Sequence, residues 1–159
     1  MPGQKFFEDV QPGMTEEFGS TLVEEAEIVE FARRYDPQPF HLDREAAKRS
    51  MFGGLAASGW HTASLMMRML VDHASTFGAS MGSPGVDELR WLRPVRPGDV
   101  LSLRVTILEA TPSRSKPDRG LVRSNVEVMN QDRDLVMTVK TMVFFRRRPA
   151  EVRVRLCLF

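Results

Sequence analysis

The side chains best suited to move protons are a carboxylate and an imidazole in the segment Tyr35–Asp43, which reads YDPQPFHLD. Asp36 and His41 stand five positions apart, and each can accept or donate a proton near neutral pH, so the pair can activate a water molecule. Pro37 and Pro39 restrict the backbone between them, which predicts an extended, stiff segment and a low entropic cost of holding the pair. Taken without other information, the same residues also fit a helix-capping Asp36 and a hydrogen-bonded loop histidine.

A second motif, FGGLAASGWH at residues 52–61, places glycines and small residues directly before an apolar helix. Gly59 falls at the start of that helix, where backbone N–H groups have no intrahelical partner and favour an oxygen that gains negative charge. Gly59 is therefore a candidate oxyanion donor, although, taken alone, a tight turn entering a core helix is the better explanation for the glycine. Ser58 could hydrogen-bond substrate or water, but we interpret it as the helix N-cap.

Helical periodicity predicts the elements that flank these motifs. Apolar residues recur at helical spacing over residues 24–35, and that helix should end at Asp36 because a residue before proline disfavours helical geometry. Asp43–Ser50 reads as a short helix with Asp43 as its N-cap. The longest apolar helix spans about Trp60–Ala74, and its narrow polar stripe predicts burial on most sides.

The second half of the chain alternates apolar and polar residues, which indicates strands. We predict strands at residues 14–23, 86–92, 101–107, 122–128 and 135–145, an irregular lead-in over residues 1–14, a loop over residues 111–120 and a hairpin turn at residues 130–133. A curved antiparallel sheet wrapped around one long buried helix is the simplest arrangement of these elements, an α+β hotdog fold. A second subunit commonly closes an open edge of such a sheet.

Composition limits the possible partners and sites. The 159 residues predict one domain over residues 1–159, with a C-terminal tail of undetermined structure from about residue 148. A net charge of +1 gives no indication of binding to nucleic acid or to an anionic membrane. A single cysteine, Cys157, rules out a disulfide within the chain and argues against a cysteine-based zinc site. With no signal-like N-terminus and no long apolar run, we expect a cytoplasmic protein without a metal site.

Together, YDPQPFHLD and FGGLAASGWH resemble the MaoC-like dehydratase family, which includes the (R)-specific enoyl-CoA hydratases. The family's motif D-x-N-P-x-H corresponds here to Asp36–His41, with Gln38 in place of the usual asparagine. This amide is one methylene longer, so a supporting hydrogen bond can move. Residues 93–99, RPVRPGD, also resemble the family's second half, and the resemblance covers most of residues 5–147.

The resemblance implies an activity and a set of site residues. The implied reaction is the reversible hydration of a trans-2-enoyl-CoA to a (3R)-hydroxyacyl-CoA, by a homodimer or higher homo-oligomer that needs no metal or redox cofactor. By position, Asp36 and His41 match the catalytic pair and Gly59 matches the oxyanion donor. Ser58 and Gln38 are further candidates for binding or supporting roles. A branched or dicarboxylic acyl group, such as a mesaconyl-type thioester, is one option for the substrate.

Other functions and other residues remain open at this point. A hotdog acyl-CoA thioesterase and a non-catalytic acyl-CoA-binding or interaction protein are the alternatives, although the intact D-x-x-P-x-H run argues against both. We expect His61 to be a packed or interface histidine and His73 to interact with the helix dipole. The basic residues Arg114, Lys116, Arg119 and Arg146–Arg148 could meet coenzyme A phosphates but read better as solvated. Met66, Met67 and Met69 are expected to line the core or an acyl pocket.

Overall fold

The computed structural model describes residues 5–73 and 79–149, and within them the chain forms one antiparallel sheet and a set of helices. The elements in chain order are η1 (Phe7–Asp9, a 3-10 helix), β1 (Thr15–Leu22), α1 (Glu25–Tyr35), α2 (Pro39–Leu42), α3 (Arg44–Lys48), α4 (Gly59–Asp72), β2 (Gly85–Trp91), β3 (Val100–Pro112), β4 (Arg119–Met129) and β5 (Leu135–Arg146). Ala74, where we expected the long helix to end, and the tail beyond residue 149 lie outside the described residues.

The sheet has the strand order β1-β3-β4-β5-β2, and each neighbouring pair is antiparallel. The predicted alternation is confirmed, because Leu101, Leu103 and Val105 of β3 are buried while the residues between them are partly exposed. The predicted loop at residues 111–120 is too long. Thr111 pairs with Leu121, so the β3–β4 hairpin continues through polar residues that carry no apolar alternation.

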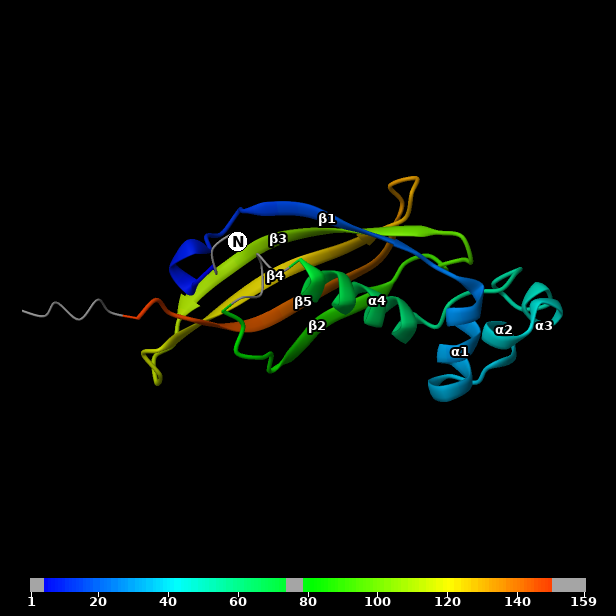
Figure 1. Cartoon of the computed structure of the whole chain (residues 1–159), viewed down its shortest axis with the longest axis horizontal. Helices are drawn as coiled ribbons and strands as arrows, with labels where there is room; N and C mark the ends of the chain where they lie inside the picture. Colours follow the sequence, from blue (N-terminus) through cyan, green and yellow to red (C-terminus); the bar gives the residue numbers. More distant parts are fainter. Residues whose placement is uncertain (1–4, 74–78, 150–159) are drawn as a thin grey trace, which may run out of the picture.

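Helix α4 lies along the curved face of the sheet, as Figure 1 shows. Its Met66, Met69 and Leu70 are buried and belong to the core formed with the inner strands. Strand β1 approaches the helix closely at Gly19, where an added Cβ would lie 2.6 Å from Sδ of Met69. Gly19 also has a φ of 83°, a backbone conformation that residues with a side chain rarely adopt. Glycine therefore suits both the close approach to Met69 and the backbone conformation at this position.

The prediction that α4 is buried on most sides is wrong, because the helix keeps an exposed apolar side. Trp60 is 59% exposed and Val71 is 58% exposed, since both lie on the side of α4 that turns away from the sheet's centre. The edge strand β2 continues this surface, and the rings of Trp60 and Trp91 meet at 5.3 Å. We call this surface the apolar face; it consists of Trp60, Met67, Val71, Val86, Trp91 and Leu92.

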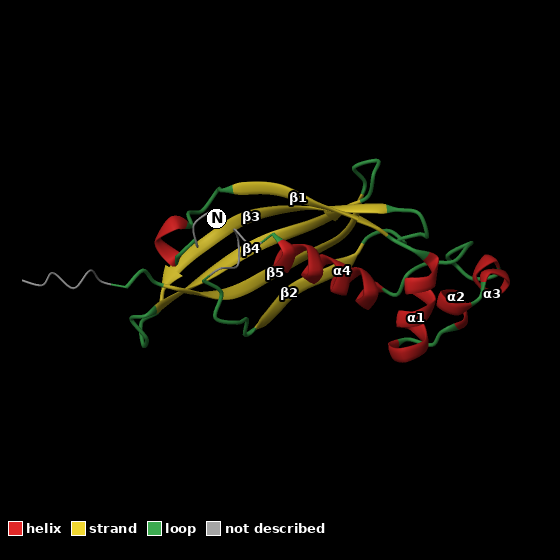
Figure 2. Cartoon of the chain, in the orientation of Figure 1, coloured by secondary structure: helices red, strands yellow, loops and turns green. Residues whose placement is uncertain are grey.

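Helices α1, α2 and α3 gather beyond one end of the sheet (Figure 2). Helix α1 ends at Tyr35 as predicted, and Asp43 caps α3 by accepting a hydrogen bond from the backbone N–H of Ala46 at 2.7 Å. The prediction of an extended segment up to His41 is wrong, because Pro39–Leu42 forms the helical turn α2. Proline is tolerated at a first helical position, where its missing N–H would have no partner.

Candidate active site

The carboxylate of Asp36 is held by hydrogen bonds to both of its oxygens. Asp36 is the C-terminal cap of α1, and its side chain is 20% exposed. The hydroxyl of Ser58 donates to Oδ2 at 2.7 Å, and the amide Nε2 of Gln38 donates to Oδ1 at 2.7 Å. The longer amide of Gln38 therefore still reaches the carboxylate, and residues from two sequence motifs fix its orientation.

The imidazole of His41 faces this carboxylate from the buried side of α2. His41 is 5% exposed, and its Nε2 lies 3.3 Å from Oδ2 of Asp36. Its Nδ1 lies 2.7 Å from the carbonyl oxygen of Ala56. Because a carbonyl can only accept a hydrogen bond, Nδ1 must carry the proton, which leaves Nε2 as the atom that exchanges a proton beside Asp36.

The surroundings of Asp36 favour its ionised form. Partial burial acts to raise the pKa of the carboxyl, but the hydrogen bonds from Ser58 and Gln38, with a further contribution from the charge of His41, outweigh this effect. The pKa of Asp36 therefore lies below its ordinary value. A carboxylate beside an imidazole, both with fixed orientations, can accept a proton from a water molecule and pass one on.

Ser58 and Gly59 connect this pair to the start of α4. Ser58 accepts a hydrogen bond from the N–H of Trp60 at 3.3 Å, as expected of an N-cap, and it also donates to Asp36, so the interpretation as a cap alone is incomplete. Gly59 is the first residue of α4, and an added Cβ would lie 2.3 Å from a ring carbon of Trp91. Glycine is therefore required here by close packing against the indole.

Comparison with known proteins identifies the family of the chain. Residues 8–130 match the family described as MaoC like domain. The chain is also 31% identical over 116 residues to the 3-hydroxybutyryl-CoA dehydratase of Methylorubrum extorquens, a match that covers 70% of this chain and 69% of the relative. The chain belongs to the MaoC-like domain family.

Solved structures support the same family and its fold. The chain is 45% identical to the MaoC-like dehydratase from Rhodospirillum rubrum, with a TM-score of 0.87 and coverage of 91% of this chain and 99% of that one. It superposes on the R-hydratase PhaJ1 from Pseudomonas aeruginosa with a TM-score of 0.73 at 23% identity, covering 90% and 86% of the two chains. The predicted α+β hotdog fold is confirmed.

The other two histidines of this MaoC-like chain do not join Asp36. His61 is buried and stacks on Phe31 at 4.9 Å, its Nδ1 has no hydrogen-bond partner among the described residues, and burial lowers its pKa. His73 is the C-terminal cap of α4, where a dipole interaction was expected, and it also makes tertiary contacts: its Nε2 lies 3.2 Å from Glu16 and its ring stacks on a phenylalanine.

Three of the six basic residues considered for phosphate contacts form ion pairs with acids. Arg119 pairs with Asp118, while Arg147 and Arg148 pair with acids of η1. The β3–β4 hairpin that carries the basic loop lies at the end of the sheet opposite α1 (Figure 1). Within one chain, the structure therefore does not bring this basic group to Asp36.

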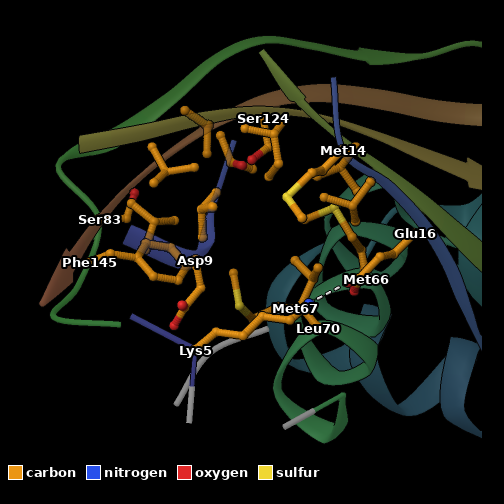
Figure 3. A pocket seen from close by; sticks show the side chains of 18 residues that line it. Lys5, Asp9, Met14, Glu16, Met66, Met67, Leu70, Ser83, Ser124 and Phe145 are labelled. Carbon is orange, nitrogen blue, oxygen red and sulfur yellow. Dashed lines mark hydrogen bonds and ion pairs between the residues drawn. The ribbon is translucent and has the colours of Figure 1, made fainter. Parts of the chain in front are cut away.

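A largely apolar cavity lies between the second half of α4 and the face of the sheet that the helix covers (Figure 3). Met66 and Met67 line it, and Met66 also packs in the core together with Met69, so Met66 occupies both of the expected places. Lys5 and Glu16 form an ion pair at its edge. The Asp36–His41 pair and the start of α4 are not part of its lining.

Sequence reasoning missed two contributors to the site. Ala56 acts through its carbonyl oxygen, and a backbone group leaves no signal in the choice of side chain. Trp91 packs on Gly59 from a strand that is distant in sequence. Within residues 5–73 and 79–149, no cluster of His, Cys, Asp or Glu could hold a metal ion, and no helix there is long and apolar enough to cross a membrane.

Proposed function

We propose that this protein catalyses the reversible hydration of a trans-2-enoyl-CoA to a (3R)-hydroxyacyl-CoA. The observation that carries the proposal is the 3.3 Å approach of His41 Nε2 to Asp36 Oδ2, with each group fixed by hydrogen bonds from elsewhere in the chain. Membership of a family that includes a 3-hydroxybutyryl-CoA dehydratase supports the choice of a coenzyme A thioester as substrate.

The proposed reaction begins with a water molecule bound between Asp36 and His41. One of the two groups takes a proton from this water as its oxygen bonds to the β-carbon of the enoyl thioester. The pair then returns a proton to the α-carbon, so the net change is the addition of one water across the double bond. Dehydration follows the same steps in reverse.

The thioester oxygen carries negative charge while the α-carbon awaits its proton. We assign the backbone N–H of Gly59 to this oxygen, because the first N–H groups of a helix have no intrahelical partner and lie at the positive end of the helix dipole. A donor of this kind contributes about 3–4 kcal/mol to transition-state stabilisation in other acyl-transfer enzymes. The proposed steps pass through side chains and backbone alone and use no metal or redox cofactor.

A homodimer or larger homo-oligomer is part of the proposal. The apolar face covers both the start of α4 and the edge strand β2, so it borders Gly59 directly through Trp91. A second copy on this face would bury its two tryptophans and close the open edge of the sheet. It would also exclude water from the surroundings of Gly59, which strengthens electrostatic stabilisation there.

The test is loss of the conjugated-enoyl absorbance when purified protein is added to a panel of trans-2-enoyl-CoA thioesters, with short, long, branched and carboxylated acyl groups. We expect turnover of at least one member and formation of its (3R)-hydroxyacyl-CoA. Release of free thiol from saturated acyl-CoA, without loss of enoyl absorbance, would instead identify a thioesterase. Binding of the panel without any turnover would identify a non-catalytic acyl-CoA-binding protein.

A further inference from the structure

The loop between α3 and α4 supplies two of the contacts that orient the Asp36–His41 pair. Its Ala56 carbonyl accepts from Nδ1 of His41, and its Ser58 hydroxyl donates to Asp36. The loop contains no helix or strand from residue 53 to residue 58. Regular backbone hydrogen bonding within the loop therefore does not fix the Ala56 carbonyl or the Ser58 hydroxyl. Whatever holds this loop also sets the geometry of the pair.

Arg96 lies in the connection between β2 and β3, and its side chain binds the loop between α3 and α4. Its Nη1 donates to the carbonyl oxygens of Gly54 at 2.6 Å and Leu55 at 3.2 Å, and its Nη2 donates to the carbonyl oxygen of Phe52. Among the described residues, no carboxylate lies within ion-pair distance of Arg96. The guanidinium is therefore committed to three backbone carbonyls rather than to an acid.

Arg96 is itself anchored to the ends of the sheet. Its backbone N–H donates to the carboxylate of Asp99 at 2.8 Å, and the N–H of Gly98 in the same turn donates to the carbonyl of Val23 at 2.8 Å. The neighbouring Val95 carbonyl accepts from the N–H of Ala57 at 2.8 Å. The turn thus connects the rigid sheet to the loop, with Arg96 providing the side-chain part of that connection.

The three carbonyls require a planar group with several donors. Arginine presents five N–H donors in a fixed plane, whereas lysine presents three from a single nitrogen and cannot span the same set. The loop accommodates the group closely, because a Cβ added at Gly54 would lie 3.3 Å from Nη1 of Arg96. Both the choice of arginine and the glycine opposite it follow from this contact.

We propose that Arg96 is a positioning residue for the reaction: it clamps the carbonyls of Phe52, Gly54 and Leu55 so that Ala56 fixes the tautomer of His41 and Ser58 stays on Asp36. Arg96 does not touch the substrate or the reacting atoms. The inference rests on the proposed function only for its effect on turnover, because the effect on the His41 tautomer is independent of any substrate.

The experiment compares Arg96→Gln with Arg93→Gln in the full chain. Arg93 lies in the same connection and pairs with Asp134 at the surface, so its variant removes the same charge without touching the loop. Arg96→Gln keeps the Ala57–Val95 backbone bond and the N–H bond to Asp99, and we expect it to fold. Arg96→Lys provides a second variant that retains the positive charge but not the planar fork.

The primary readout is the nitrogen NMR signal of His41 in histidine-labelled protein. We expect wild type and Arg93→Gln to show one tautomer with the proton on Nδ1, and both Arg96 variants to show a mixture. In turnover, kcat of Arg96→Gln should fall about 10- to 100-fold while KM changes less, since a small misplacement of catalytic groups has effects of this size. Arg96→Lys should fall between wild type and Arg96→Gln.

The outcomes separate this inference from the proposed function. An unchanged His41 tautomer in folded Arg96→Gln or Arg96→Lys would overturn the positioning role, whatever the turnover. A shifted tautomer in a protein that hydrates no enoyl thioester would support the clamp and count against the proposed reaction. If Arg93→Gln changes the tautomer as much as Arg96→Gln does, the effect is one of charge alone and the clamp is wrong.

Discussion

Asp36 receives two hydrogen bonds from neutral donors and lies beside one imidazole, so its ionised form is favoured despite partial burial. Ser58 links this preference to the start of α4, because the same hydroxyl accepts from the helix and donates to the carboxylate. The side chain therefore has two separable effects, one on the pKa of Asp36 and one on the stability of the helix.

Ser58→Ala tests both effects. Removal of the hydroxyl takes away a hydrogen bond that lowers the pKa of Asp36, so that pKa should rise and the acid limb of the kcat/KM profile should move to higher pH. Loss of the cap should also lower the free energy of unfolding by about 1 kcal/mol. The matched control is Ser50→Ala, which removes a hydroxyl bonded to the end of α3. A profile that is identical in wild type and Ser58→Ala would contradict the assigned interaction.

His61 should make the fold sensitive to acid. Burial lowers the pKa of His61 in the folded state below its ordinary value of 6.5, so the unfolded chain binds more protons between those two values. Stability should then fall as the pH drops below 6.5 toward the lowered pKa of the folded state. His61→Phe preserves a ring against Phe31 and should show a smaller loss over the same range in urea unfolding. Equal pH dependence in both proteins would show that His61 is not responsible.

At the scale of elements, the start of α4 depends on Trp91 of strand β2, which packs against it. Gly59→Ala should destabilise the fold and reduce turnover, because its Cβ would lie 2.3 Å from a ring carbon of Trp91. Trp91→Ala removes that ring and should restore stability to the Gly59→Ala protein, which a double-mutant cycle of unfolding free energies would measure. Additive effects of the two substitutions would contradict the proposed contact.

Helices and strands can be predicted from the sequence where the local pattern of residues permits only one conformation. The strands follow from alternation because one face of each central strand is buried, as in Leu101 and Leu103. The helical turn at Pro39–Leu42 was missed because proline permits a first helical turn as readily as an extended segment. The Asp36–His41 pair could be identified from its motif, whereas the clamp by Arg96 depends on contacts across 41 to 44 positions of sequence.

At the scale of the whole molecule, the exposure of the apolar face is not explained by packing within a single chain. Its large side chains are about half exposed, and Trp60 of the helix meets Trp91 of the edge strand at a ring distance of 5.3 Å. Val71→Asp places a charge on this face and should convert a dimer into a monomer, as measured by sedimentation. Met51→Asp is the control, because Met51 is 93% exposed in the loop after α3 and is not part of the face. A wild-type protein that sediments as a monomer would contradict the proposed assembly.

The central claim is that Asp36 and His41 add water to the β-carbon of an enoyl thioester. The most direct measurement follows heavy oxygen from labelled water into the product by mass spectrometry, using crotonyl-CoA and the best substrate of the panel. We predict label in the β-hydroxyl group with wild type, and a rate lowered about 100- to 10,000-fold in Asp36→Asn, which should remain folded. The exposed Glu30→Gln on α1 should match wild type. Label in a released carboxylate, or an unchanged rate in Asp36→Asn, would contradict the account.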